Sequence, residues 1–282
     1  MRRWVAAISL LLAGFVFASP VHADTLERVK EKGVFRIGYR ADARPHSFQD
    51  AGGRPTGYIV DLCREVASTV KRAVGNEQLQ IEYVVVTASN RFEQVTKGDI
   101  DILCEASSVS IARRQIVDFS IPTFVDGAAM LSRNGTEYPS FESLAGKRVG
   151  VLTNTTSAEL LRSSLEQLGI KATVVPMNDH GEGAGSLSAG KIDVYFGDRS
   201  ILASLLFRKD VPEGLQLGKR YFSYETYGLA FAPGDYKFRL LVDRTLARLY
   251  RTGAAEAAIQ RAFGAPPDEL LKIMVAINGI PD

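Results

Sequence analysis

The spacing of hydrophobic residues along the chain alternates between two periods, one typical of β-strands and the other of α-helices. Apolar and polar residues alternate over residues 33–40 (GVFRIGYR), whereas Leu62, Val66 and Val70 lie four positions apart in the next apolar segment. The elements predicted by this pattern are strands at 33–40, 79–86 and 100–104, and helices at 57–74 and 90–98. This strand–helix–strand order indicates βαβ units and therefore an α/β fold with parallel strands.

The same pattern starts again at Lys147. It predicts strands at 147–152, 172–177 and 192–198, and helices at 155–169, 185–191 and 199–209. A late strand at 227–233 and helices at 237–253 and 254–264 are expected to follow. The chain therefore predicts two consecutive α/β units of about a hundred residues each.

The first 23 residues have the layout of a secretory signal. Arg2 and Arg3 precede an apolar stretch from Trp4 to Ala18, and small residues end the segment at Ala23. A membrane anchor is the alternative, but the apolar stretch is shorter than the roughly 20 residues that span a bilayer. We therefore expect cleavage before Asp24 and export of the remaining chain.

Removing this segment changes the charge of the protein. Lys and Arg together number 34 in the full chain and Asp and Glu 32, so loss of Arg2 and Arg3 leaves a formal charge of zero. A balanced charge argues against a nucleic-acid partner and against binding to a membrane surface through a basic patch. About 259 residues remain, a length at which two domains are the better expectation.

The remaining chain offers little for metal or nucleophilic chemistry. It contains no GxxxxGK[ST], HExxH or GxSxG motif and only two histidines, His46 and His180, so we expect no metal, no cofactor and no serine triad. Cys63 and Cys104 are too far apart for a CxxC motif. Export would place them in an oxidising compartment, where they form either a disulfide or two buried thiols.

Five longer motifs occur in order between about Thr25 and Gly264. They are GVFRIGYRADARPHSFQDAGGRPTGYIVDLCREVA, RRQIVDFSIPTF, SLAGKRVGVLTNTTS, NDHGEG and YETYGLAFAPGD. Together they resemble the motifs of the periplasmic solute-binding proteins for polar amino acids, family 3. Within that family, SNR with DILCEASS, and NDHG with FGD, are most similar to glutamate/aspartate-binding proteins. The resemblance implies an amino-acid ligand and delivery to an ABC permease from the periplasm.

The resemblance also implies the type II periplasmic-binding-protein fold, in which two crossover strands join two α/β lobes. Matching the motifs assigns residues 24–124 and 227–282 to lobe 1 and residues 125–226 to lobe 2. The two hinges would then lie near residues 123–127 and 223–227. Such a receptor opens and closes, and we expect it to be a monomer.

The ligand contacts follow from the same match. Arg113 corresponds to the arginine that binds the α-carboxylate, Thr156 to a second contact with that group, and Asp198 to the partner of the α-ammonium. The remaining expected ligand-binding residues are Arg40, Arg91, Ser108 and His180. Of these, Arg40, Arg91 and His180 match the groups that meet an acidic side chain, so glutamate or aspartate is the expected ligand.

The residues alone permit simpler interpretations. An Arg113–Arg114 pair is typical of an exposed helix surface, and Thr155 and Thr156 are suited to cap a helix. If His180 contacts the ligand as a cation, affinity should fall between about pH 6 and 8; the alternative is a neutral imidazole.

Three positions depart from the glutamate/aspartate pattern. Ala88 and Ala106 replace serines, and Glu105 replaces a glycine beside the cleft. These differences leave a neutral polar amino acid or another dicarboxylate as alternative ligands. A dehydratase-like enzyme with Glu105 as general acid is a further alternative, as is a sensor instead of a permease as partner.

Overall fold

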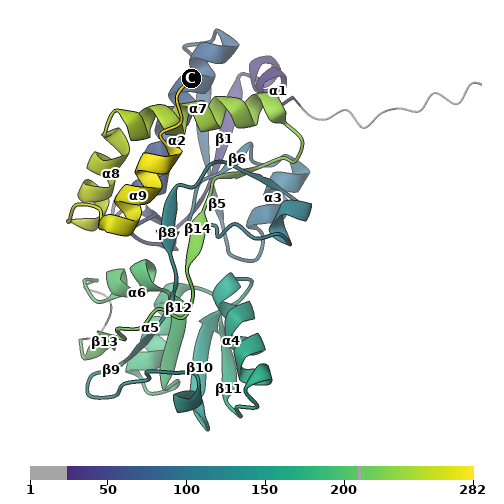
Figure 1. Ribbon diagram of the computed structural model, residues 1–282. Coiled ribbons are helices and arrows are strands. Elements are labelled where there is room, and N and C mark those ends of the chain that lie inside the picture. The colour runs from purple at the N-terminus through teal and green to yellow at the C-terminus, as the bar shows by residue number, and fades with distance from the viewer. Residues whose placement is uncertain (1–23, 209–210, 212) are drawn as a thin grey trace, which may run out of the picture.

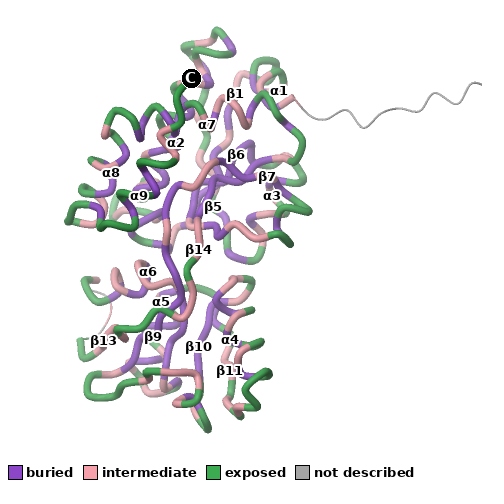
Figure 2. The backbone as a smooth tube through the Cα atoms, in the orientation of Figure 1, coloured by how far each residue is buried: buried purple, intermediate pink, exposed green. Residues whose placement is uncertain are grey.

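The computed structural model describes residues 24–208, 211 and 213–282, which form two α/β lobes joined by a pair of strands (Figure 1). This confirms the expected fold class. The segment predicted to be a signal, residues 1–23, lies outside the described residues. Buried positions concentrate in the centre of each lobe, whereas the connecting strands contain both buried and intermediate positions (Figure 2).

Lobe 1 is built on a mixed five-stranded sheet in the order β5-β1-β6-β15-β7. Its strands are β1 (Val34–Arg40), β5 (Gln80–Val86), β6 (Ile102–Leu103), β7 (Asp118–Phe119) and β15 (Ala230–Phe231). β1 is parallel to β5 and β6, whereas β15 is antiparallel to β6 and β7. A small sheet of β2 (Asp42–Ala43), β3 (Ser47–Gln49) and β4 (Pro55–Thr56) follows β1.

Helices cover both faces of the lobe 1 sheet. They are α1 (Thr25–Lys32), α2 (Tyr58–Val74), α3 (Arg91–Lys97), α7 (Tyr236–Arg251), α8 (Ala254–Phe263) and α9 (Glu269–Asn278), with a 3-10 turn η1 (Arg113–Gln115). The apolar stripe of α2 packs with α7, α8 and α9 against Phe35 and Ile37 of β1. On the opposite face, Val95 of α3 packs with Val86, Leu103 and neighbouring residues.

Lobe 2 repeats this arrangement with the sheet order β11-β10-β12-β9-β13. Its strands are β9 (Ala128–Arg133), β10 (Arg148–Leu152), β11 (Thr173–Met177), β12 (Val194–Asp198) and β13 (Leu215–Leu217), and its helices are α4 (Thr156–Gln167), α5 (His180–Ser188), α6 (Arg199–Leu205) and the 3-10 turn η2 (Glu142–Leu144). Successive side chains of β12 point to opposite faces of the sheet. Val194 and Phe196 pack with α4, whereas Tyr195 packs with α5 and α6.

Two strands cross between the lobes and pair with each other. β8 (Phe124–Asp126) and β14 (Glu225–Tyr227) are antiparallel, and Figure 1 shows them in the space between the two sheets. Immediately after β8, a Cβ on Gly127 would lie 1.8 Å from the carbonyl oxygen of Ser223. Only glycine allows the two backbones to come this close.

A buried polar network lies beside this strand pair. The Tyr227 hydroxyl is 3.1 Å from Asp126 Oδ2 and 2.8 Å from Asp198 Oδ2. Ser200 Oγ donates to Asp126 Oδ2 at 2.5 Å and is 2.7 Å from Nε2 of His46, a lobe 1 residue. Burial and the neighbouring Asp198 carboxylate raise the pKa of Asp126 to about 7.

Several element boundaries differ from the sequence prediction. The helix predicted at 185–191 begins earlier, at His180, because Asp179 accepts a hydrogen bond from Glu182 N and caps it. The predicted strand at 227–233 is divided between β14 and β15, since the chain exchanges β8 for the lobe 1 sheet as its pairing partner. Helix 199–209 ends at Leu205, and α1 and α9 were not predicted.

Within the described part of the chain, none of the helices combines the length and apolar character required to cross a membrane.

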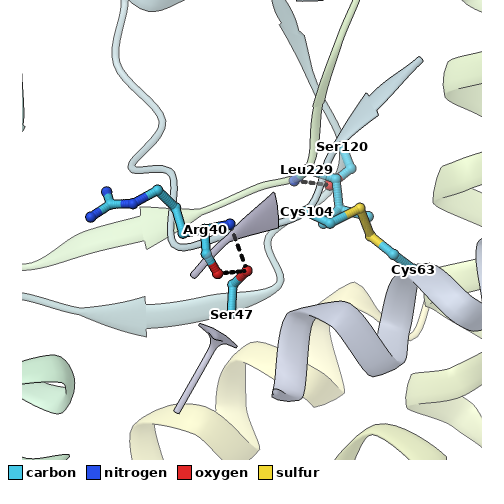
Figure 3. The surroundings of a disulfide bond; sticks show 6 residues. All are labelled: Arg40, Ser47, Cys63, Cys104, Ser120 and Leu229. Carbon is cyan, nitrogen blue, oxygen red and sulfur yellow. Dashed lines mark hydrogen bonds between the residues drawn. A yellow bond between two sulfur atoms is a disulfide. The ribbon is translucent and has the colours of Figure 1, made fainter. Parts of the chain in front are cut away.

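Cys63 of α2 and Cys104, just after β6, form a disulfide, which decides between the two alternatives, and their Cα atoms are 6.3 Å apart (Figure 3). The bond fastens α2 to the end of a central strand. Glu105 and the following residues, which approach the other lobe, therefore leave the sheet from a covalently fixed point.

Replacing both cysteines by alanine should lower the free energy of unfolding by about 4 kcal/mol, the chain-entropy value for a crosslink that spans 41 positions. Urea unfolding followed by circular dichroism under non-reducing conditions measures the difference. As a control, a reductant should destabilise the wild-type protein and leave the double variant unchanged. Equal stability of the two proteins would contradict a stabilising role.

The raised pKa of Asp126 predicts a pH-dependent stability. Because its ordinary value of 3.8 applies to the unfolded chain, this carboxyl group favours folding at low pH, and the contribution is lost as pH rises through about 7. The free energy of unfolding of the wild type relative to Asp126→Asn should therefore fall by about 2.5 kcal/mol between about pH 5 and pH 8. Both proteins retain His46 and His180, whose titration changes stability with pH in the opposite direction. Subtracting the unfolding free energies of the two proteins, each measured with urea, cancels the contribution of these histidines. A difference independent of pH would show that Asp126 is ionised throughout this range.

Candidate functional site

A narrow cavity of about 20 Å³ lies between the lobes. Its lining comes from both sides: Arg40, Ala43, Arg91, Glu105, Ala106, Ser108 and Arg113 from lobe 1, and Thr155, Thr156, Asp198 and Ile201 from lobe 2. This volume is close to that of one water molecule. An amino acid would fit only if the lobes or the lining side chains moved apart.

Arg113 is the first residue of η1 and is buried, whereas its neighbour Arg114 is exposed. Its Nη1 donates to the carbonyl oxygen of Ser108 at 2.8 Å, and its guanidinium centre is 5.1 Å from the centroid of the Phe92 ring. It forms no ion pair with another residue in the described ranges. The guanidinium is thus held in place with N–H groups left for an anion.

The start of α4 faces Arg113 from lobe 2. Thr155 caps the helix by accepting from Ala158 N, so the capping role falls to this residue. Thr156 Oγ1 donates to Glu225 Oε2 at 2.6 Å and is 3.1 Å from Ser108 Oγ, across the cleft. Free backbone N–H groups at this helix end favour an anion near Thr156.

Asp198 ends β12 at the point where α6 begins. Its Oδ1 accepts from Ser157 Oγ at 2.7 Å and its Oδ2 from the Tyr227 hydroxyl at 2.8 Å. Burial, reinforced by the Glu225 carboxylate, raises the pKa of Asp198, while Arg113 acts in the opposite direction. A cation in the cavity would favour the ionised form of Asp198.

Arg40, at the end of β1, is paired within the protein. Its Nε and Nη2 donate to the two carboxylate oxygens of Asp42 at 2.7 Å each (Figure 3 shows its side chain without Asp42). Asp42 Oδ2 also accepts from His180 N at 3.2 Å. Burial tends to raise the pKa of Asp42, but Arg40 and His180 outweigh it and hold the pKa below the ordinary value.

Arg91, the first residue of α3, is also paired. Its Nε is 3.3 Å from Glu105 Oε1, and both side chains are buried. Its Nη1 donates to the carbonyl oxygen of Ala88 at 2.7 Å and its Nη2 to that of Asn154, in lobe 2, at 3.0 Å. Glu105 accepts a further hydrogen bond from the Ser107 hydroxyl. Burial lowers the pKa of Arg91 to about 10, against the effect of Glu105, so Arg91 is charged at neutral pH.

His180 is the one expected ligand-binding residue that does not line the cavity. Its Nδ1 is 2.9 Å from the Tyr195 hydroxyl, inside lobe 2. Burial lowers its pKa to about 4, so the imidazole is neutral at neutral pH. This favours the neutral-imidazole interpretation and gives no reason to expect titration between pH 6 and 8.

The structure therefore brings six expected residues into one cavity, namely Arg40, Arg91, Ser108, Arg113, Thr156 and Asp198. Sequence reasoning missed Ala43 and Ile201 as cavity residues. It also missed Glu225, which accepts from Thr156, and Tyr227, which donates to Asp198. The apolar ones carry no chemical signal. Tyr227 and Glu225 lie in the family-like motif YETYGLAFAPGD, but nothing in their spacing indicates a role.

Comparison with curated proteins gives relatives over most of the chain. Residues 35–265 match the family model of bacterial extracellular solute-binding proteins, family 3. The chain is 28% identical over 271 residues to the L-glutamate/L-aspartate-binding protein of Pseudomonas aeruginosa, covering 94% of this chain and 90% of the relative. It is 27% identical over 260 residues to the glutamate/aspartate import solute-binding protein of Escherichia coli, covering 92% and 86%.

Solved structures share the two-lobed fold. The P235GK mutant of ArgBP from T. maritima has a TM-score of 0.75 at 23% identity, covering 86% of this chain and 100% of that chain. The ancestral amino acid-binding protein AncCDT-1, a precursor of cyclohexadienyl dehydratase, has a TM-score of 0.74 at 24% identity and the same coverage. Because the family model spans most of the sequence, this chain belongs to the bacterial extracellular solute-binding proteins, family 3.

Proposed function

We propose that this protein binds an α-amino acid in the cavity between its lobes and delivers it to an ABC permease. The observation that carries the proposal is the pair Arg113 and Asp198, which line the same buried cavity from opposite lobes. The guanidinium suits an α-carboxylate and the carboxylate suits an α-ammonium, so the pair is complementary to a zwitterion. Thr156 would be a second contact for the α-carboxylate.

Binding would proceed by closure of the lobes. β8 and β14 would bend as the hinges near residues 123–127 and 223–227, with residues 24–124 and 227–282 moving against 125–226. Contacts across the cleft support a closed arrangement, since Arg91 reaches Asn154 O and Thr156 reaches Ser108. An amino acid would enter when these contacts are broken and would be enclosed when they re-form.

The proposed partner, an ABC permease, is suggested by the name of one relative. One is named an import solute-binding protein, which supports delivery of the ligand to a transporter. The protein would act in the periplasm after removal of its signal, as a monomer, and the closed form would be recognised by the permease. A sensor that reads the same closed form is the alternative partner.

The side chain of the ligand could be acidic or neutral and polar, and different observations support each class. An acidic side chain is supported by the names of the relatives in Pseudomonas aeruginosa and Escherichia coli and by the presence of Arg40 and Arg91. A neutral polar side chain is favoured by the carboxylates of Asp42 and Glu105, which already pair with these two arginines.

Catalysis by Glu105 is not part of the proposal. Glu105 pairs with Arg91 and accepts from Ser107, so its carboxylate already has two partners within the protein. The likeness to a dehydratase precursor concerns the fold. Binding without turnover is the activity that this arrangement supports.

Arg113→Ala should lower the affinity for the amino-acid ligand at least about 100-fold, because truncation removes one partner of a buried charge-assisted pair. A thermal-shift panel of amino acids on protein refolded free of ligand identifies the best binder, and isothermal titration then compares the variants. Arg114→Ala is the matched control, since this neighbour is exposed and should keep wild-type affinity. Equal losses in both variants, or none in Arg113→Ala, would contradict the assignment.

A further inference from the structure

The cavity contains a negative charge that the binding of a zwitterion does not require. Glu105 is 1% exposed, lines the cavity, and lies 3.3 Å from Nε of Arg91. Arg40, a second lining arginine, is paired with Asp42. Of the three arginines in the cavity, Arg113 alone has no carboxylate partner among the described residues.

This pairing decides which charges remain for the ligand. If Arg113 takes the α-carboxylate and Asp198 the α-ammonium, the groups left for the side chain are two ion pairs, each with no net charge. A ligand carboxylate would have to share Arg91 with Glu105, so two like charges would lie within a few ångströms in a buried space. A cationic side chain would meet the guanidinium groups of Arg40 and Arg91.

The Arg91–Glu105 pair is anchored at both ends. Carbonyl oxygens of Ala88 and Asn154 hold the guanidinium, and the Ser107 hydroxyl holds the carboxylate. Cys104, which precedes Glu105, is fixed to α2 by the disulfide. Rotation of Glu105 away from Arg91 would leave two buried charges without partners, which is strongly unfavourable.

We propose that Glu105 is a selectivity residue which excludes acidic amino acids and makes the ligand one with a neutral carboxamide side chain, asparagine or glutamine. This inference rests on the proposed function. A carboxamide can donate from its nitrogen to Glu105 and accept with its oxygen from Arg91, so it satisfies both members of the pair. Glu105 would then substitute within the protein for the carboxylate that an acidic ligand brings.

The test compares ligands that are nearly identical in shape and differ in charge. Isothermal titration at neutral pH measures glutamine against glutamate and asparagine against aspartate, on the full-length mature protein freed of ligand. The better carboxamide should bind at least about tenfold more tightly than its acidic counterpart. In Glu105→Gln, this ratio should fall at least about tenfold, mainly through tighter binding of the acidic ligand.

Asp101→Asn is the matched control. Asp101 is a buried carboxylate in the same lobe, paired with Arg28 outside the cavity, so its loss affects stability without changing the ratio. Circular dichroism establishes that each variant is folded. If Glu105→Gln does not fold, the wild-type ratio alone tests the proposal.

The outcomes separate the two proposals. A wild-type preference for glutamate or aspartate, or an unchanged ratio in Glu105→Gln, would overturn the role of Glu105 while Arg113-dependent binding still stands. A protein that binds none of the four amino acids overturns the role of Glu105. If the wider amino-acid panel also gives no binder, the proposed function fails with it.

Discussion

The geometry of the molecule depends on the paired strands that cross between its lobes. β8 and β14 are hydrogen-bonded to each other, and the glycine that follows β8 allows the backbone at Ser223 to approach closely. Because these crossings connect the lobes, they determine which strand ends and helix starts face one another. Arg113 and Asp198 are separated by 85 positions in sequence and meet at one cavity only because of this connection.

The polar residues beside the crossings are tied to the same cavity. Tyr227 lies in β14 and its hydroxyl is close to both Asp126 of β8 and Asp198 of the cavity. Ser200 extends this network to His46 in lobe 1. A change in the charge of Asp198 therefore alters its electrostatic interaction with groups on the connecting strands, since buried charges interact through a medium that screens them poorly.

Two of the arginines that line the cavity are already paired with carboxylates of the protein. The chain keeps Arg40 and Arg91, but Asp42 and Glu105 pair with them. A carboxylate beside a guanidinium cancels its charge, whereas the alanines at positions 88 and 106 add none. The net charge that the cavity presents therefore depends on these pairings as well as on the number of arginines.

Local patterns in the sequence were sufficient for most of the fold. Period-two and period-four hydrophobicity predicted β1, α2, β10 and α4 to within about two residues, because each buries a regular face against a neighbour. The short strands were harder to place. β14 and β15 form one apolar run in sequence, and their separation reflects a change of pairing partner, which no local signal encodes.

For the site, the sequence determined the chemical groups and, through the family motifs, which of them to consider together. The tertiary structure decided their pairing. His180 matches a ligand position in sequence, yet its ring lies against Tyr195 because α5 packs on that side of the lobe 2 sheet. Glu105 and Arg91 form an ion pair because α3 and the end of β6 meet beside the cleft. Such partnerships arise from residues distant in sequence, so they exist only once the chain has folded.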